Sequence, residues 1–346
     1  MSKFIFKVVA FLFSIISIIV FVSYFGDAGG IYYKKNIYVN IANNLLNNKF
    51  VYINSNIDER TLQKEIIFRS KKIPNSIVLG SSRVMQLGPL NNEYDFYNHS
   101  VSGCSIEDIA ALLQMYKIKY NYFPNKIIIG LDPWIFNIHN EQKRYKSIEK
   151  YYKDFYSYNT HSSFFNNIDY YYQLFNPSYF NPSFKSLFSN NNTFTVSDSL
   201  QNGKMCRLPN GTIQYDSLNE FPKKSDLDIL VKKMLQNSVY SLEKFTSIDK
   251  NKMNEFEVLI KKLSYSNCDL TFIIVPLHPD IFSFISKSKK YVNVIQSEII
   301  FRKLAKKYNI KLYGSLNPFL YNYKESSFFD PFHLRKNETN LLLNYN

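Results

Sequence analysis

Four short apolar segments that end at a glycine or a turn place the strongest constraint on how this chain folds. They are residues 76–80, 126–130, 270–275 and 310–314. Apolar residues recur at helical spacing at 105–116, 253–263 and 292–308, and a Ser105-x-x-Asp108 capping box opens the first of these helices. Short, continuously apolar strands that alternate with helices are typical of a parallel sheet covered on both faces. The sequence therefore predicts an α/β domain whose ligands bind beyond the carboxyl ends of the strands.

The N-terminus carries the strongest local signal in the chain. Residues 8–25 contain no charged side chain and follow Lys3 and Lys7. A run of this length approaches the roughly 20 apolar residues that cross the hydrocarbon core as a helix, and the basic flank places the N-terminus in the cytoplasm. We therefore expect an uncleaved, single-pass membrane anchor with the domain outside the cytoplasm, either periplasmic or extracellular. A cleavable signal peptide is the alternative, for which residues 26–30 form a poor cleavage site.

The pattern divides the chain into an anchor (1–25), a juxtamembrane segment (26–73) and one large domain (74–346). The alternation of strands and helices breaks at about residues 141–224, a stretch rich in Tyr, Asn, Phe and Ser with a hairpin signal at 209–212. We interpret this stretch as an inserted aromatic and Asn-rich subdomain. Its side chains suit a sugar-binding face, and a small helical subdomain of biased composition is the alternative.

The amount and distribution of charge restrict the classes of molecule that this chain could bind. The 42 Lys+Arg and 28 Asp+Glu residues give a formal net charge of +14. The lysines occur as scattered pairs, without a dense basic block, an arginine-rich segment or a nucleic-acid-binding motif. This distribution disfavours nucleic acid as a partner. A solvated lysine surface accounts for the charge, and attraction to an anionic glycan or a lipid headgroup is the functional alternative.

The cysteines and histidines indicate no metal site. Cys104, Cys206 and Cys268 lie far apart without CxxC spacing, which argues against structural zinc and against a disulfide framework. Buried free thiols are the expected state, with a Cys206–Cys268 bridge as the alternative in an oxidising compartment. The spacing of the histidines outside the motifs below suggests no set of metal ligands; these are His99, His139 and His161.

Two motifs at opposite ends of the domain carry side chains for nucleophilic catalysis. Gly80-Ser81-Ser82-Arg83 follows an apolar strand and precedes a helix, whose N-terminal amides and dipole can stabilise an oxyanion at Ser82. Asp330-Pro331-Phe332-His333 places a carboxylate three residues before a histidine, a spacing that suits orienting the imidazole. Together they predict Ser82 as nucleophile, His333 as general base and Asp330 as its orienting group.

These blocks, in this order, resemble the SGNH (GDSL-type) hydrolase superfamily. Residues 80–83 resemble its first block and residues 330–333 its last. Residues 98–103 resemble the second block, which implies that Gly103 joins the Ser82 amide in an oxyanion hole. The third block, G-x-N-D in the family, falls at Gly130-Leu131-Asp132-Pro133. The resemblance covers residues 74–140 and 265–340 and implies a flavodoxin-like, three-layer domain.

Asp132 departs from the family pattern. It stands where the family has an asparagine whose amide donates a hydrogen bond to the oxyanion, whereas an ionised carboxylate only accepts and would repel an oxyanion. Three alternatives follow: a neighbour such as Asn137 supplies the donor, Asp132 has a structural role, or catalysis is impaired. Asp132 is thus the third candidate for the oxyanion hole, beside Ser82 and Gly103.

The anchor, the GSS variant and the insertion resemble extracytoplasmic members of the superfamily, among them teichoic-acid D-alanyl transfer and alginate O-acetylation proteins. This resemblance implies a membrane-anchored acyl esterase or O-acyltransferase, with acetyl as the expected group, that acts on cell-envelope polysaccharide without a cofactor. The implied partners are an acylated envelope glycan, the membrane and a membrane protein that supplies the acyl group. Arg83, His278 and Trp134 are the candidate substrate contacts.

Two other classes of function remain as alternatives. A non-catalytic glycan-binding or assembly protein on the same fold would account for Asp132 and for the aromatic insertion. A lipid-headgroup binder driven by net charge is the other alternative, and it predicts salt-sensitive binding to anionic vesicles.

Overall fold

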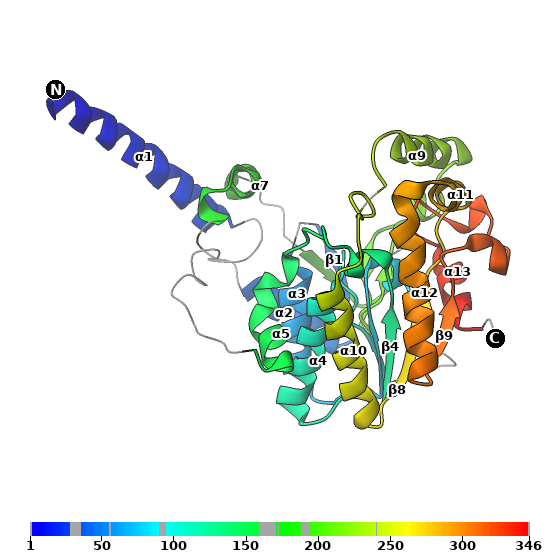
Figure 1. Cartoon of the computed structure of the whole chain (residues 1–346). Coiled ribbons are helices and arrows are strands. Elements are labelled where there is room, and N and C mark those ends of the chain that lie inside the picture. Colours follow the sequence, from blue (N-terminus) through cyan, green and yellow to red (C-terminus); the bar gives the residue numbers. More distant parts are fainter. Residues whose placement is uncertain are drawn as a thin grey trace.

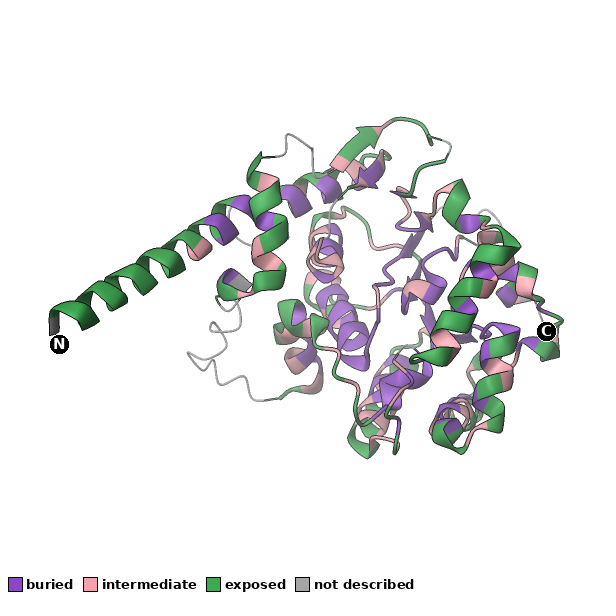
Figure 2. Ribbon diagram, turned by 90° about the horizontal axis from the view of Figure 1, so that it is seen from above, coloured by how far each residue is buried: buried purple, intermediate pink, exposed green. Residues whose placement is uncertain are grey.

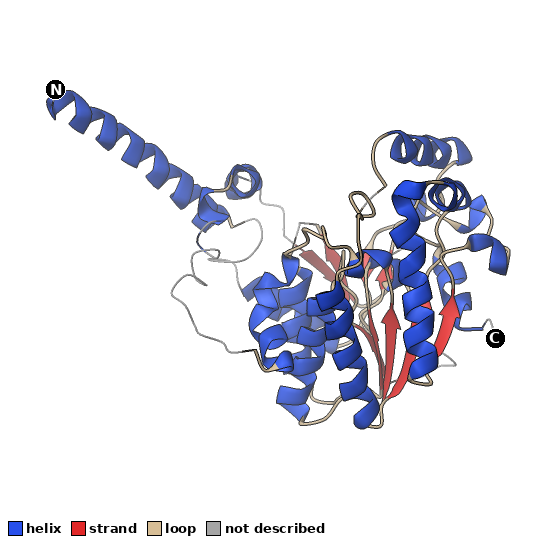
Figure 3. Ribbon diagram, in the orientation of Figure 1, coloured by secondary structure: helices blue, strands red, loops and turns tan. Residues whose placement is uncertain are grey.

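A five-stranded parallel sheet forms the centre of the computed structural model (Figure 3). Its strands lie in the order β3-β2-β4-β8-β9, and their bounds are β2 Ser76–Leu79, β3 Phe96–Asn98, β4 Lys126–Gly130, β8 Asp269–Ile274 and β9 Lys311–Gly314. The four strands predicted from apolar runs are confirmed to within one residue at each end. The sequence did not predict β3, because three residues are too few for a periodic signal. The chain reverses its direction of winding between β2 and β4, where open α/β sheets form ligand sites.

The structure describes residues 2–27, 36–54, 57–89, 95–158, 171, 173–188, 194–201, 203–239 and 241–344. Alternate side chains of the strands point into two apolar cores. Ile77 and Leu79 of β2 join the larger core, whereas Val78 joins the smaller one. This alternation follows from the two-residue side-chain period of a strand.

Helices cover one face of the sheet and the C-terminal segment covers the other. α4 (Ile106–Tyr120), α10 (Lys250–Tyr265) and α12 (Val292–Lys307) pack on the larger core, and Figure 1 shows α10 and α12 in front of the strands. The smaller core is closed by side chains of the last 30 residues, namely Tyr323, Phe328, Leu334 and Leu342. The predicted capping box is confirmed, since Ser105 Oγ accepts from the Asp108 amide and the Asp108 carboxylate accepts from the Ser105 amide. In the described part of the chain, the long helices therefore lie on one face of the sheet, and the C-terminal segment with the short helix α13 (Lys336–Leu341) lies on the other.

A second, antiparallel sheet has the order β5-β1-β6-β7. Its bounds are β1 Phe50–Ile53, β5 Phe194–Ser197, β6 Cys206–Arg207 and β7 Ile213–Gln214. The pairing of β6 with β7 confirms the predicted hairpin at residues 209–212. β1 comes from the stretch that precedes the parallel sheet, and it packs with α2 (Asn36–Leu46) and α3 (Glu59–Arg69) around a small core of its own. The stretches before residue 74 and around residue 200 thus share one sheet.

The N-terminal helix α1 (Ser2–Gly26) projects from the domain; residues 3–18 are all exposed, and residues 22, 23 and 26 at its domain end are buried (Figure 2). Among the described residues, it is the one helix long and apolar enough to cross a membrane. Further helices are α5 Glu149–Tyr156, α7 Pro177–Phe188, α8 Ser217–Glu220, α9 Lys224–Gln236, α11 Pro279–Lys287 and α13 Lys336–Leu341. All three cysteines are free thiols, and the alternative Cys206–Cys268 bridge does not form.

Candidate active site

Ser82, His333 and Asp330 form a continuous chain of hydrogen bonds. Ser82 Oγ lies 2.8 Å from His333 Nε2, and His333 Nδ1 lies 2.7 Å from Asp330 Oδ2. Because the Asp330 carboxylate accepts, Nδ1 carries the proton and Nε2 is free to accept the hydroxyl proton of Ser82. The serine and the histidine are both partly exposed to solvent. This arrangement leaves the Ser82 hydroxyl accessible, with an imidazole positioned to accept its proton.

A tight turn after strand β2 sets the position of Ser82. Strand β2 ends at Leu79, and a single 3-10 turn begins at Ser82, with the Ser81 side chain capping it by accepting the Arg83 amide at 3.2 Å. Gly80 between them has φ of +154°, a conformation that L side chains rarely adopt. The turn thus redirects the chain at the carboxyl edge of the sheet, so that Ser82 faces the histidine.

The Asp330–His333 turn is held by its own backbone and by an aromatic ring. Asp330 Oδ1 accepts from the amides of Phe332 and His333 at 2.7 and 2.8 Å, while the Phe329 ring stacks on the imidazole with a centroid distance of 5.4 Å. Burial by itself would raise the pKa of Asp330, but the His333 ring and these two amides outweigh it and hold the pKa below its usual value. Asp330 therefore remains ionised when the imidazole gains a proton.

Two backbone amides are available for an oxyanion. Within the described part of the chain, the N–H groups of Ser82 and Gly103 donate no hydrogen bond. The loop that carries Gly103 lies beside the nucleophile, because the Val101 amide donates to the Gly80 carbonyl at 2.9 Å. The Asn98 amide group holds the two loops together by donating to the carbonyls of Val84 and Leu87. These contacts place both candidate donors on adjoining loops at one edge of the sheet.

Helix α3 supports the Gly103 loop from outside. Arg60 is almost fully buried; it donates to the Ser102 carbonyl at 2.9 Å and forms an ion pair with Asp108 at 2.8 Å. Gln142 donates to the Gly103 carbonyl at 2.7 Å. Sequence reasoning missed these supports, because Arg60 lies in the segment interpreted as juxtamembrane and has no motif around it.

Arg83, the second residue of the turn that begins at Ser82, forms a buried ion pair with Asp132. Arg83 Nη1 lies 2.9 Å from Asp132 Oδ1, with the two side chains 1% and 5% exposed. Burial raises the pKa of the Asp132 carboxyl, and the Arg83 charge opposes that shift. The guanidinium keeps its proton at any ordinary pH, so the pair carries no net charge into the site. Among the alternatives for Asp132, this geometry corresponds to the structural role.

The same guanidinium joins the loops that carry the site. Its Nε donates to the Phe332 carbonyl at 3.1 Å, and Nη2 donates to the carbonyls of Val275 and Pro276 at 2.6 and 2.8 Å. Arg83 thereby connects the nucleophile's turn, the loop after β8 and the histidine's turn. With 2% exposure, Arg83 has no surface to offer a substrate.

The other candidate substrate contacts also lie inside the protein. Trp134 is 3% exposed and its indole N–H donates to the Cys104 carbonyl at 3.2 Å. His278 is 1% exposed and caps α11 by accepting the Asp280 amide; burial lowers the pKa of its ring. The Asn137 amide group donates to the carbonyls of Ser241 and Glu243, and this bonding anchors a loop on the helical side. The structure thus brings together Ser82, His333, Asp330, Arg83 and Asp132, with the Gly103 loop beside them, whereas Trp134 and His278 are buried and bonded to other groups.

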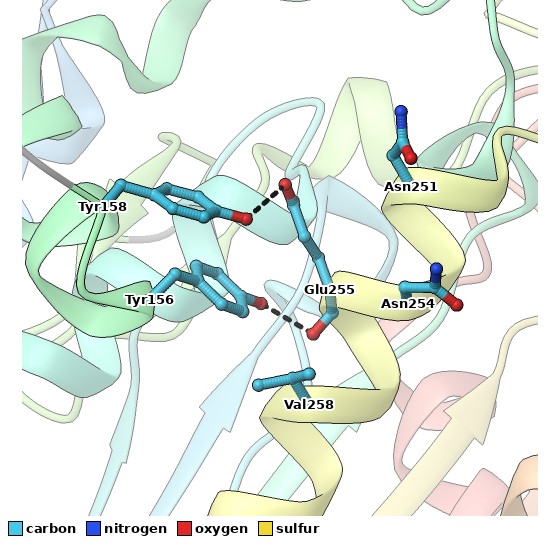
Figure 4. Close-up of a pocket in the computed structure, with 6 residues that line it drawn as sticks. All are labelled: Tyr156, Tyr158, Asn251, Asn254, Glu255 and Val258. Atoms are coloured by element: carbon cyan, nitrogen blue, oxygen red, sulfur yellow. Dashed lines mark hydrogen bonds between the residues drawn. The ribbon is translucent and has the colours of Figure 1, made fainter.

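A cavity of about 400 Å³ lies apart from these residues, between α5 and α10 (Figure 4). In it, Tyr158 donates to the Glu255 carboxylate at 3.2 Å and Tyr156 to the Glu255 backbone carbonyl at 2.8 Å. The tyrosine hydroxyls are therefore engaged in joining two helices, and the hydrogen-bonded serine and histidine define the candidate site better than this hollow does. In the described part of the chain, no group of three or more His, Cys, Asp or Glu side chains is arranged to hold a metal ion.

The sequence of this chain matches no known protein-family model, and no curated protein is similar to it.

Proposed function

We propose that this protein is a membrane-anchored, SGNH-like serine esterase or O-acyltransferase that acts on acyl groups of a cell-envelope polysaccharide. The observation that carries the proposal is the 2.8 Å contact between Ser82 Oγ and His333 Nε2, with Asp330 bonded to the far side of the ring. The strand order also supports the family resemblance. In chain order the strands lie 2-1-3-4-5 across the sheet, as in flavodoxin-like folds.

The reaction proceeds in two steps. Ser82 Oγ attacks the ester carbonyl while His333 Nε2 takes the hydroxyl proton, and Asp330 stabilises the imidazolium that forms. The amides of Ser82 and Gly103 bind the developing oxyanion, and His333 returns the proton to the leaving alcohol. The acyl group is then on Ser82. Attack by water completes hydrolysis, whereas attack by a sugar hydroxyl completes transfer.

The Arg83–Asp132 pair explains how the site can work with aspartate in the third block. An unpaired carboxylate would repel the oxyanion, but the guanidinium 2.9 Å away neutralises its charge. The oxyanion then lacks the hydrogen bond that the asparagine of the family pattern would donate, and only the backbone amides of Ser82 and Gly103 stabilise it. Removal of one such donor costs other acyl-transfer enzymes roughly 10²–10³ in turnover. We therefore expect a slow enzyme.

The proposal that the substrate lies in the cell envelope depends on α1 spanning the membrane. A helix of 25 residues at 1.5 Å per residue is about 37 Å long and can span the hydrocarbon core of about 30 Å. With the N-terminus in the cytoplasm, the domain would lie at the outer surface, where envelope polysaccharides are acylated.

A fluorophosphonate probe tests the proposal on the full-length protein in lipid nanodiscs. We expect covalent labelling of the wild type, no labelling of Ser82→Ala, and unchanged labelling of Ser326→Ala, a control at an exposed serine near the C-terminus. Release of acetate from p-nitrophenyl acetate would follow the same order. Absence of labelling in a folded wild type would overturn the catalytic proposal and would favour a glycan-binding protein.

A further inference from the structure

Helix α7 packs tightly against the end of α1 that meets the domain. A side chain at Gly26 would overlap the backbone carbonyl of Ser183, so the two helices approach at small residues. Tyr179 adds a polar contact by donating to the Asp27 carboxylate at 2.6 Å. Close approach at small residues is how helices associate in membranes. The position of α7 is therefore tied to that of α1.

The two helices cross at a steep angle. Figure 1 shows α1 lengthwise and α7 nearly end-on beside its last turns. A helix that crosses a membrane-spanning helix in this way, at the point where the latter leaves the hydrocarbon core, lies along the membrane surface. The length of α1 places Gly26 near that surface.

One face of α7 is apolar and uncovered. Phe180, Phe184 and Phe188 recur every four residues, with successive ring centroids 6.0 and 5.1 Å apart. Phe184 is 47% exposed and Phe188 is 77% exposed, and Leu187 on the same face is 39% exposed. The opposite face carries Ser178, Pro182 and Ser186, and Asn181 and Lys185 lie at the border between the two faces. An aromatic face with a lysine at its border is the composition of an interfacial helix.

We propose that α7 is a second membrane contact, which lies in the lipid headgroup region with Phe184, Leu187 and Phe188 inserted toward the acyl chains. Lipid is the occupant that the surroundings favour, because α1, against which α7 packs, exposes apolar side chains along nearly its whole length. This second contact restricts the tilt and rotation of the domain about α1. The inference rests on α1 spanning the bilayer, and it is independent of the proposed esterase activity.

Depth-dependent fluorescence quenching tests this contact on the full-length protein in vesicles that contain brominated phosphatidylcholine. Tryptophan is introduced at one position at a time, and the signal of the buried Trp134 is subtracted with the parent protein. We expect Phe188→Trp, and Phe184→Trp as a second reporter, to lose most of their emission, as Phe13→Trp in the middle of α1 should. Pro182→Trp, at an exposed position on the opposite face, should lose much less.

Tyr265→Trp is the reference for a position in water, since Tyr265 is the last residue of α10 and is 85% exposed. The inference is overturned if Phe13→Trp is quenched while the reporters at 184 and 188 are quenched no more than Tyr265→Trp. A protein partner or a second copy on this face would produce that result, because it would shield both reporters from lipid. Equal quenching at positions 182 and 188 would also contradict the proposed orientation.

Discussion

The Ser82 hydroxyl lies 2.8 Å from Nε2 of His333, although 251 positions separate the two residues in the chain. Ser82 follows the first strand of the parallel sheet, and His333 lies in the C-terminal segment that closes the smaller core. Packing of that segment on the sheet is therefore what brings the Ser82 hydroxyl and the His333 imidazole together.

The orientation of the imidazole depends on Asp330. We predict that Asp330→Asn lowers the rate of labelling by the fluorophosphonate probe on the order of 10³–10⁴-fold, because an amide at this position favours the wrong ring tautomer. Glu325→Gln, a change at an exposed surface ion pair of the same segment, should label at the wild-type rate. The rate is measured by the time course of probe incorporation. An Asp330→Asn rate within a fewfold of wild type would contradict the assigned role.

The buried ion pair predicts strong coupling between Arg83 and Asp132. Arg83→Met and Asp132→Leu each leave a buried charge without its partner, which costs about 3–5 kcal/mol of unfolding free energy. The double variant removes both charges, so its loss should be well below the sum of the single losses. Part of the loss should persist in the double variant, since the carbonyls of Phe332, Val275 and Pro276 lose their hydrogen bonds from the guanidinium. Denaturant unfolding of the four proteins in detergent measures the coupling, and additive losses would refute it.

Close packing predicts that Gly130 cannot accept a side chain. A Cβ at Gly130 would lie 2.7 and 2.8 Å from the two methyl groups of Val84, in the turn that begins at Ser82. We expect Gly130→Ala to destabilise the protein by about 1–3 kcal/mol and to slow labelling of Ser82, because the turn must shift. The second change Val84→Ala should restore part of both losses.

Gly88→Ala is the matched control for Gly130→Ala, since the nearest atom to a Cβ there is 3.8 Å away. Melting temperature and labelling rate are measured for each variant. The packing argument fails if Gly130→Ala behaves like Gly88→Ala, or if Val84→Ala gives no rescue.

Because the His99 ring is buried, we predict that the protein loses stability in mild acid. The ring is fully enclosed between Gln63 and Tyr116, at 2.7 and 2.6 Å, and burial, with a smaller contribution from the Arg207 charge, lowers its pKa to about 3. In the unfolded chain the pKa is about 6.5, so between these values the unfolded state binds more protons. Stability contributed by neutral His99 is thus present above pH 6.5 and is lost as the pH falls toward 3.

The expected loss from this residue is about 2 kcal/mol between pH 7 and pH 5. His99→Gln should flatten the pH dependence of the unfolding free energy by that amount, whatever its effect at pH 7. Denaturation curves at the two pH values test this, and an unchanged slope in His99→Gln would contradict it.

Local signals determined much of this fold. The four apolar runs gave strands in the expected places, the Ser105 capping box gave a helix start, and residues 209–212 gave a hairpin. Each of these is encoded within a few residues, because side-chain period, capping and turn chemistry act over one or two turns of chain. The same holds for the apolar N-terminal helix.

The sequence by itself also determined which residue types could form a catalytic site, through two short motifs at the ends of the domain. Only the tertiary structure decided that Ser82 meets His333, that Asp132 is neutralised by Arg83, and that Trp134 and His278 are buried away from solvent. The physical reason is that a motif specifies the chemistry of its own side chains, whereas burial and ion pairing depend on which distant segments pack together. Those partners are set by the order of the strands and by the path of the C-terminal segment, and no local pattern records them.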